Sequence, residues 1–204
     1  MRQKLIIFVK APRPGFVKTR LANTIGAENA CVAYNKLVTT LVNRLSALKE
    51  VELRFAPDDA ANEIAPWLRP TWVAAPQGRG DLGERLRRAF DHAFAAGWER
   101  VAIIGSDCPA VTERDILDSW NLLARNDAVL GPANDGGYWL IALKASAPDL
   151  FTKIHWSTAE VLKQTLAKLA STKRSCHLLR ELRDIDTEDD WNRFVAENQL
   201  LSQN

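Results

Sequence analysis

Cysteine is scarce in this chain, and the three that occur, Cys31, Cys108 and Cys176, are far apart. No pair has the close spacing of a zinc ligand set or of a redox dithiol, so reduced thiols in a cytoplasmic protein are expected. Long hydrophobic runs are also missing. The N-terminal apolar run covers only residues 5–9 and ends at a lysine, which is too short for a signal peptide or a membrane span. These absences predict a soluble protein without a membrane partner.

The chain also lacks an excess of one charge. It has 27 Lys and Arg against 25 Asp and Glu, a formal net charge of +2, and the basic residues are spread along the sequence. A nucleic-acid partner is therefore not expected, although a local anion site remains open. There is no internal repeat and no low-complexity segment. A length of 204 residues, 47% of them hydrophobic, predicts a single domain over residues 1–204.

Short apolar runs alternate with amphipathic stretches along the chain. Continuous β-rich runs predict buried strands, and apolar residues at helical spacing predict helices. This alternation predicts an α/β fold, a three-layer αβα sandwich whose mostly parallel sheet has helices on both faces. A turn at residues 135–137 between two close strands predicts a short antiparallel excursion. The strands are expected at residues 5–9, 51–56, 71–75, 101–104, 128–130, 138–142 and 177–182, and the helices at residues 28–48, 60–68, 84–96, 113–123, 158–169 and 188–195.

A basic loop, residues 10–20, directly follows the first strand. Its prolines limit its freedom, and its single glycine permits positive φ or a close backbone approach. Lys18 and Arg20 could neutralise a polyphosphate, and α/β folds bind phosphate after the first strand. The loop is not a Walker A motif, because Phe16 and Val17 separate the glycine from the lysine. The alternative interpretation is a solvated basic loop.

Acidic residues occur at two later places in the chain. Asp107 comes at the end of the most apolar strand, where a carboxylate is well placed to hold Mg²⁺ or Mn²⁺, or alternatively caps a turn. Asp184 and Asp186 alternate on extended chain, so both side chains can face the same side and offer a second metal contact. Thr187 is the expected cap of the last helix. A nucleophilic role for Cys108 has no evident histidine to support it.

Two glycine-rich turns complete the candidate site. In the first, residues 77–84, Asp81 is either a helix cap or, with Gly80, a contact to a base or ribose. The second contains Asp135, Gly136 and Gly137. These residues form an ordinary turn signal, or they let the chain pass close to an acceptor substrate.

The motifs together resemble bacterial nucleotide-diphospho-sugar-transferase-like proteins of the glycosyltransferase A superfamily, of the DUF2064 type. The resemblance covers nearly the whole chain. It rests on six ordered motifs, which are FVKAPRPGFVKTRLA from Phe8, QGRGDLGERL from Gln77, GSDCP from Gly105, GPANDGGYWLIAL from Gly131, HWSTAEVLKQT from His155 and DIDTEDDW from Asp184. It implies the glycosyltransferase A fold.

The resemblance also implies roles for residues and a metal-dependent reaction with Mg²⁺ or Mn²⁺. Lys18 and Asp107 would be catalytic, and Asp107 would hold the metal, with Asp186 as the second ligand that the spacing of the acids suggests. The nucleotide would contact the basic loop and the first glycine-rich turn, and the acceptor would contact the second turn. The expected nucleotide-binding residues are Lys10, Pro12, Gly15, Lys18, Arg20, Gly80 and Asp81, and the expected substrate-binding residues are Asp135, Gly136 and Gly137.

Three functions are compatible with these residues. The first is a glycosyl transferase that uses a nucleotide-sugar donor and a small-molecule acceptor. The second is a nucleotidyltransferase that moves NMP from an NTP to a phosphorylated acceptor. Where many sugar transferases have Asp-x-Asp, this chain has Ser106-Asp107-Cys108, which offers one carboxylate. It also lacks the glycine-dense loop of typical nucleotidyltransferases. The third is a non-catalytic nucleotide-binding accessory protein. The sequence makes no prediction of oligomeric state.

Overall fold

The computed structural model describes residues 1–201, so the expected domain over residues 1–204 is described as far as residue 201. A single seven-stranded sheet runs through it in the order β3-β2-β1-β4-β6-β5-β7. β6 pairs antiparallel with both β4 and β5, and the other pairings are parallel. This confirms the mostly parallel sheet with one antiparallel excursion. The strands are β1 Gln3–Lys10, β2 Val51–Ala56, β3 Val73–Pro76, β4 Arg100–Ile104, β5 Ala128–Pro132, β6 Tyr138–Leu143 and β7 Cys176–Leu178.

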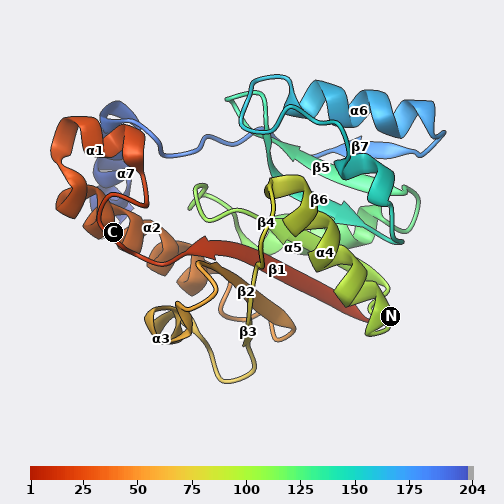
Figure 1. The fold of residues 1–204 in the computed structure, drawn as a ribbon, viewed down its shortest axis with the longest axis horizontal. Coiled ribbons are helices and arrows are strands. Elements are labelled where there is room, and N and C mark those ends of the chain that lie inside the picture. Colours follow the sequence, from red (N-terminus) through yellow and green to blue (C-terminus); the bar gives the residue numbers. More distant parts are fainter. Residues whose placement is uncertain (202–204) are drawn as a thin grey trace.

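Helices cover both faces of the sheet (Figure 1). The alternation of side chains along β1 divides the core, because Leu5, Ile7 and Val9 pack in one cluster while Ile6 packs in the other. The first cluster contains residues of α2, α3, η1 and α5, and the second contains residues of α4, η2 and α6. These elements are α2 Ala27–Arg44, α3 Ala61–Ile64, the short 3-10 helix η1 Ala65–Trp67, α4 Leu82–Ala95, α5 Glu113–Leu122, the short 3-10 helix η2 Pro148–Phe151 and α6 Val161–Ser171.

Two further helices extend the layer formed by α2. α1 Thr19–Ile25 and α7 Glu188–Leu201 lie beside α2 at the end of the molecule away from α6 (Figure 1). Trp191 of α7 packs against a small cluster shared by α1 and α2, and Phe194 packs with Leu37 of α2 and with Ile185. The chain that leads into α7 is thereby fixed next to α1.

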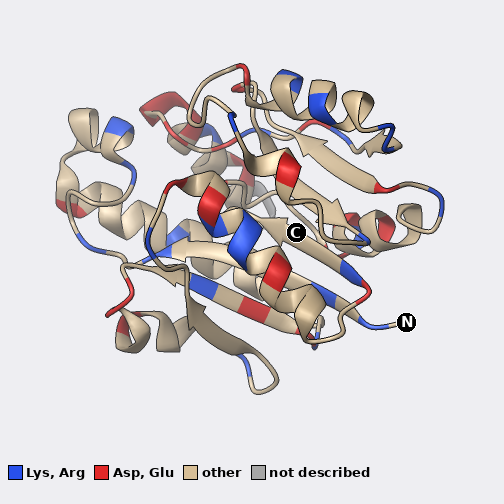
Figure 2. Cartoon of the chain, turned by 45° about the vertical axis from the view of Figure 1, so that its right-hand side comes forward, with Lys and Arg blue, Asp and Glu red and all other residues tan. Residues whose placement is uncertain are grey.

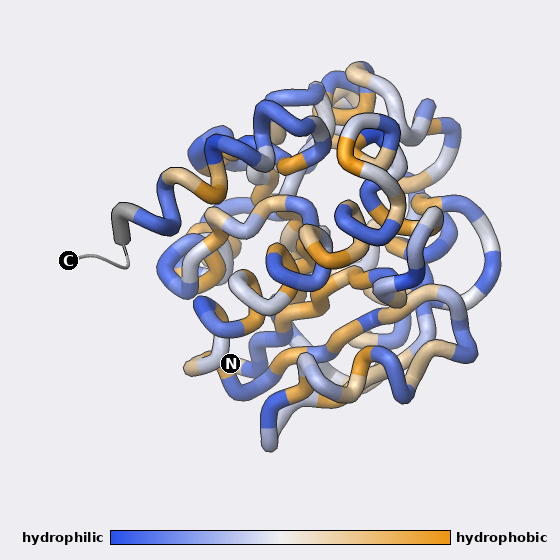
Figure 3. Tube along the Cα trace, turned by 90° about the vertical axis from the view of Figure 1, so that its left-hand side faces the viewer, coloured by the Kyte–Doolittle hydropathy of each residue, from blue (hydrophilic) through white to orange (hydrophobic). Residues whose placement is uncertain are grey.

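Hydropathy follows this layering. Hydrophobic segments concentrate on the strands, and the helices alternate between hydrophobic and hydrophilic residues (Figure 3). Charged residues of both signs are distributed over helices and loops (Figure 2). No helix within residues 1–201 is both long enough and apolar enough to cross a bilayer.

The structure adds two short helices and moves several boundaries. α1 and η2 were not expected, because each is short and neither has a repeating apolar face. The expected strand at residues 177–182 is only Cys176–Leu178, and beyond it the chain contacts β5 through single bonds from the Leu179 and Leu182 amides. α6 begins at Val161 rather than at residue 158. The helix cannot include Ser157, which lies three residues before the N-cap Glu160, because Ser157 adopts a left-handed φ of 62°.

Candidate active site

A cavity of about 740 Å³ opens at the edge of the sheet where β1 and β4 end and β6 begins. It is the position where open α/β sheets bind ligands. Most of the residues expected to form the site line it, although they come from separate parts of the chain. The lining includes Lys10, Lys18, Arg20, Gly80, Asp81, Asp107, Asp135, Gly137, Asp184 and Asp186. Pro12, Gly15 and Gly136 do not line the cavity.

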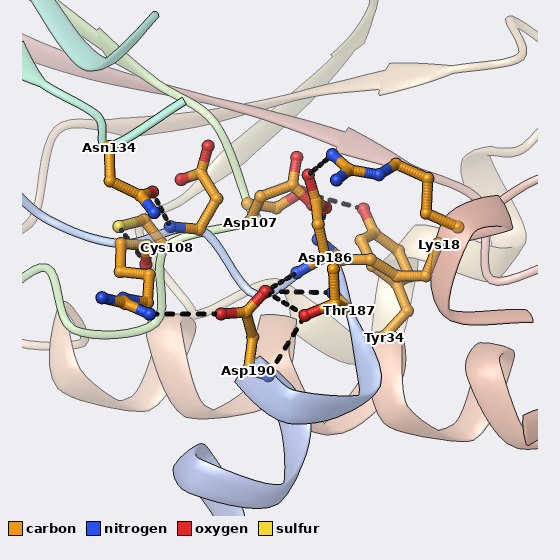
Figure 4. A network of polar contacts seen from close by, with 12 residues as sticks. Lys18, Tyr34, Asp107, Cys108, Asn134, Asp186, Thr187 and Asp190 are labelled. Carbon is orange, nitrogen blue, oxygen red and sulfur yellow. Dashed lines mark hydrogen bonds and ion pairs between the residues drawn. The ribbon is translucent and has the colours of Figure 1, made fainter. Parts of the chain in front are cut away.

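Lys18 is the most deeply placed cation of the basic loop. Its side chain is only 2% exposed, and its Nζ forms ion pairs with Asp107 and, at 3.0 Å, with Asp186 (Figure 4). Burial alone would lower the pKa of the Lys18 ammonium, but the two carboxylates outweigh this effect and raise the pKa above its ordinary value. The lysine therefore stays charged, and it joins the basic loop to the acids expected at the site.

The backbone of Lys18 is unusual as well. It is the N-cap of α1, with φ 47° and ψ 46° in the left-handed region, and no side chain caps that helix end. Non-glycine residues in this region carry strain that the surrounding structure must balance, and such residues cluster at functional sites. Here the two ion pairs fix the side chain.

The rest of the basic loop is anchored away from the cavity. Arg13 pairs with Glu63 at 2.6 Å and with Asp59 at 3.2 Å, so this cation is occupied by the α3 region. The Cys31 thiol donates to the carbonyl of Pro12 at 2.8 Å. Gly15 adopts φ 81°, which the turn requires. Pro12 and Gly15 thus shape the loop, while Lys18 and Arg20 face the cavity.

Tyr34 of α2 joins the ends of two strands beneath the site. Its buried hydroxyl accepts from the Lys10 amide at 2.8 Å and lies 3.0 Å from the Ser106 hydroxyl. Burial raises the pKa of this phenol, so it stays protonated and can donate to Ser106. The hydrogen bonds hold the end of β1 at a fixed position relative to the turn that carries Asp107.

An acidic segment, residues 182–187, crosses the mouth of the cavity. Leu182 is hydrogen-bonded to the end of β5, since its amide donates to the Pro132 carbonyl at 3.0 Å. The Ile185 amide then donates to the Asp107 carbonyl at 3.0 Å, and Asp186 reaches Arg20 at 3.4 Å. Burial of Ile185 between the two acids directs Asp184 and Asp186 to the cavity, as their alternation predicts.

The two acids of this segment have different surroundings. Burial, followed by the negative charges of Asp107, Asp135 and Asp186, raises the pKa of Asp184 to about 7. Asp186 instead has two cationic partners, Lys18 and Arg20.

The segment ends in a helix cap at the start of α7. Thr187 and Asp190 form reciprocal bonds, in which the Asp190 amide donates to Thr187 Oγ1 at 3.3 Å and the Thr187 amide donates to Asp190 at 3.1 Å. This confirms Thr187 as the cap (Figure 4).

The first glycine-rich turn is held by α4. Asp81 caps that helix in a capping box with Glu84, which confirms the structural interpretation of Asp81 without testing a ligand contact. Arg88 donates to the carbonyls of Gln77 at 2.5 Å and Arg79 at 2.7 Å, and Arg85 donates to the carbonyl of Gly80 at 2.9 Å. The arginines fix the turn at one wall of the cavity.

The second glycine-rich turn closes the opposite wall. Asp135 accepts from the Gly137 amide at 2.8 Å, which is the turn role that its sequence context predicts. A Cβ at Gly136 would collide with the backbone of Ala159. Gly136 therefore permits the turn to pack directly against the chain that leads into α6.

The donor set fits a divalent cation by its chemistry. Asp107, Asp184 and Asp186 offer carboxylate oxygens, the ligands that Mg²⁺ and Mn²⁺ prefer. The lining has five aspartates against four cations, so the cavity has no excess of positive charge. The aspartates are Asp81, Asp107, Asp135, Asp184 and Asp186, and the cations are Lys10, Lys18, Arg20 and Arg85. As the side chains stand in residues 1–201, however, no three acidic, histidine or cysteine groups are arranged to hold a metal. The ammonium of Lys18 occupies the space between Asp107 and Asp186.

Three lining or neighbouring residues were not singled out correctly from sequence. Trp156 lines the cavity and also packs against the core. Arg85 and Tyr34 have no local motif that indicates their roles. Cys108 is buried at 2% exposure and its thiol donates to the Arg183 carbonyl. Burial raises the pKa of this thiol, which argues against a nucleophile.

Comparison with known proteins places the chain in a family. A family model described as "Uncharacterized protein conserved in bacteria (DUF2064)" matches residues 40–158. A solved structure from Desulfovibrio desulfuricans G20, described as a "putative nucleotide-diphospho-sugar transferase", is 35% identical. The match covers 91% of this chain and 82% of that one, with a TM-score of 0.85.

More distant relatives include nucleotidyltransferases. The 2-phospho-L-lactate guanylyltransferase of Methanothermobacter thermautotrophicus is 26% identical over 147 residues, which are 72% of this chain and 65% of that protein. The chain thus spans slightly under two thirds of this relative's length. The protein Rv0371c of Mycobacterium tuberculosis, whose structure is a complex with manganese, is 14% identical. It matches over 96% of this chain and 99% of that one with a TM-score of 0.55, which shows the shared fold.

Proposed function

Because this chain belongs to the DUF2064 family, whose matched relatives are transferases, we propose that it is a metal-dependent glycosyl transferase with a nucleotide-sugar donor. The observation that carries the proposal is the meeting of Lys18 and Arg20 with Asp107 and Asp186 in one cavity. Cations and metal-binding acids side by side are what a diphosphate leaving group requires. The family relative from Desulfovibrio desulfuricans supports the sugar donor.

In this proposal the basic loop binds the donor phosphates. Lys18 exchanges its carboxylate partners for phosphate oxygens, and the more exposed Arg20 closes on the diphosphate from the solvent side. Asp107 and Asp186 would hold Mg²⁺ or Mn²⁺, with Asp184 as a further oxygen donor. When bound, the metal would neutralise charge on the phosphates as the leaving group departs.

The remaining residues position the donor and acceptor. The bonds of Tyr34 hold Lys10 and the Ser106 turn at a fixed separation, so that the basic loop and Asp107 act on the same phosphates. The turn at Gly80 and Asp81 would lie along the base or ribose. Asp135 and Gly137 would face the acceptor from the other wall. Such positioning lowers the barrier by replacing a collision between free reactants with a bound geometry.

Nucleotidyl transfer is the second candidate. The guanylyltransferase relative favours it, and two cations after a rigid loop suit a triphosphate equally well. In that reaction an acceptor phosphate attacks the α-phosphorus of an NTP and pyrophosphate leaves.

Product identification separates the candidates. The protein is incubated with Mg²⁺ or Mn²⁺, acceptor candidates, and a panel of nucleotide sugars and NTPs. Release of a nucleoside diphosphate from a nucleotide sugar is the expected result, whereas release of pyrophosphate from an NTP would replace the glycosyl proposal with the nucleotidyl one. Asp107→Asn should abolish product, and Asp118→Asn, a partly exposed acid of α5 outside the cavity, is the matched control. Nucleotide binding without product in either protein would support a non-catalytic accessory role.

A further inference from the structure

The cations that line the cavity are all on one side of it. Lys10 ends β1, Lys18 and Arg20 flank the start of α1, and Arg85 is in α4. We call this side the basic half. The opposite side is formed by the turn before β6 and by residues 156–161, and we call it the aromatic half. Among the residues that the structure describes, no Lys, Arg or His lines the aromatic half.

Two carboxylates and two hydroxyls supply the polar side chains of the aromatic half. Asp135 and Asp184 line it together with Ser157 and Thr158. Asp184 is beside the second glycine-rich turn, because its amide contacts Asn134 Oδ1 at 3.4 Å. The polar side chains are thus acidic or neutral throughout this half.

An aromatic wall stands next to these groups. Trp156 lines the cavity and packs against Gly83, where a Cβ would lie 2.5 Å from Trp156 Nε1. The absence of a side chain at Gly83 lets the indole lie directly on the first turn of α4. A flat apolar surface beside hydrogen-bond acceptors is typical of a site for a polyhydroxyl ring, since the ring's C–H groups pack on the indole.

The start of α6 does not provide an anion site in place of the missing cations. Helix N-termini bind phosphate through free amides, but here the amides are used within the protein. The Leu162 amide donates to the Gly136 carbonyl at 2.9 Å, and the Glu160 amide contacts Thr158 Oγ1 at 3.3 Å. The N-cap residue is Glu160, whose negative charge would repel an anion.

We propose that the aromatic half takes an uncharged hydroxyl compound, of the sugar or polyol class, and excludes phosphorylated acceptors. A phosphomonoester carries about −1.5 to −2 charges at neutral pH, and here it would face the Asp135 carboxylate with no lysine, arginine or histidine of the aromatic half to neutralise it. A hydroxyl instead donates a hydrogen bond to this carboxylate. This inference rests on the proposed function, because it names the acceptor of the same cavity.

In the proposed reaction, the acceptor hydroxyl attacks the sugar of the donor. The acceptor oxygen forms a bond to the sugar carbon of the donor, and the bond between that carbon and the diphosphate oxygen breaks. The nucleoside diphosphate leaves with the electron pair. The hydroxyl proton passes to the Asp135 carboxylate.

Matched acceptor pairs test the inference. Each hydroxyl compound is offered beside its own phosphomonoester, for example glucose with glucose 6-phosphate and glycerol with glycerol 3-phosphate, and product release from the donor is measured. The uncharged member is expected to have a kcat/KM at least about tenfold higher. Asp135→Asn should narrow that ratio by lowering KM for the phosphomonoester, because one repelling carboxylate is gone. Asp118→Asn should leave the ratio unchanged.

The outcomes separate this inference from the proposed function. Equal or better use of the phosphomonoester, with any nucleotide-activated donor, overturns the inference and leaves nucleotide-dependent transfer standing. A protein that nucleotides stabilise in a thermal-shift assay, but that uses neither member of any pair, also overturns it. If no nucleotide raises the melting temperature, with or without metal, the proposed function itself fails.

Discussion

Replacing Lys18 with Met should change the binding of nucleotide and of metal in opposite directions. The Lys18 ammonium contacts Asp107 and Asp186 in the ligand-free protein, and in the proposed reaction it moves to the donor phosphates. Methionine keeps most of the side-chain volume and removes the charge. Nucleotide then loses one of its cations, whereas a divalent metal loses a competitor for the same carboxylates.

The magnitudes follow from these contacts. A hydrogen bond to a charged group contributes about 1.5–3 kcal/mol, which corresponds to a roughly ten- to hundredfold weaker nucleotide Kd. For the metal, two unit charges about 4 Å apart in a water-like medium interact by about 1 kcal/mol. That is about 2 kcal/mol for a divalent ion, so Mn²⁺ binding without nucleotide should tighten by about thirtyfold or more. The water-like value is a lower bound, because Lys18 is only 2% exposed, although Asp107 is 50% exposed and Asp186 is 32% exposed.

Calorimetry of nucleotide and electron paramagnetic resonance of free Mn²⁺ measure the two affinities separately. Lys49→Met, at an exposed lysine outside the cavity, is the matched control and should change neither. Equal weakening of both ligands would indicate that Lys18 only maintains the shape of the site. Unchanged nucleotide affinity would refute its role at the phosphates.

Three further predictions concern the wall, the core and the acids of the cavity. Gly83→Ala should displace Trp156 and raise KM for the acceptor more than KM for the donor, which steady-state kinetics with each substrate varied would measure. Burial tends to raise the pKa of Asp115. Hydrogen bonds from Arg180 and from Thr112, the N-cap of α5, nevertheless hold this pKa below its ordinary value. Asp115→Ala should therefore cost about 1–3 kcal/mol in urea unfolding at pH 7, and the difference should shrink as pH falls below about 4. Asp184, with a pKa raised to about 7, holds a proton in the folded chain that the unfolded chain releases near pH 4. Metal-free protein should thus lose melting temperature as pH rises from about 4 to about 7, and Asp184→Asn should lack this fall.

The sequence predicted the sheet well where apolar runs are continuous. The strand at residues 51–56 has the expected bounds. The antiparallel excursion could be predicted because a short turn joins its two strands directly. α1 was missed because its seven residues show no repeating apolar face and begin at a left-handed Lys18. Short elements that tertiary packing stabilises carry little local signal.

The candidate site was predictable in its parts and not in its pairings. Individual motifs indicated Lys18, Asp107 and Asp186 as functional residues, since charged residues after strands converge at one edge. That Lys18 and Asp186 touch each other, 168 residues apart in the chain, follows only from the path of the acidic segment. Trp156 was similarly ambiguous, because a tryptophan in the core and one in a cavity wall look alike in sequence.

The position of the acidic segment after β7 has a consequence for the order of synthesis. All seven strands of the sheet have left the ribosome before Asp184 and Asp186 emerge. Because chains fold from the N-terminus as they are made, the sheet and the basic loop can form first, with Lys18 paired only to Asp107. A nascent or truncated chain that stops before residue 184 would then carry the basic loop and Asp107 on a complete sheet, without the other two acids of the proposed metal site and without α7.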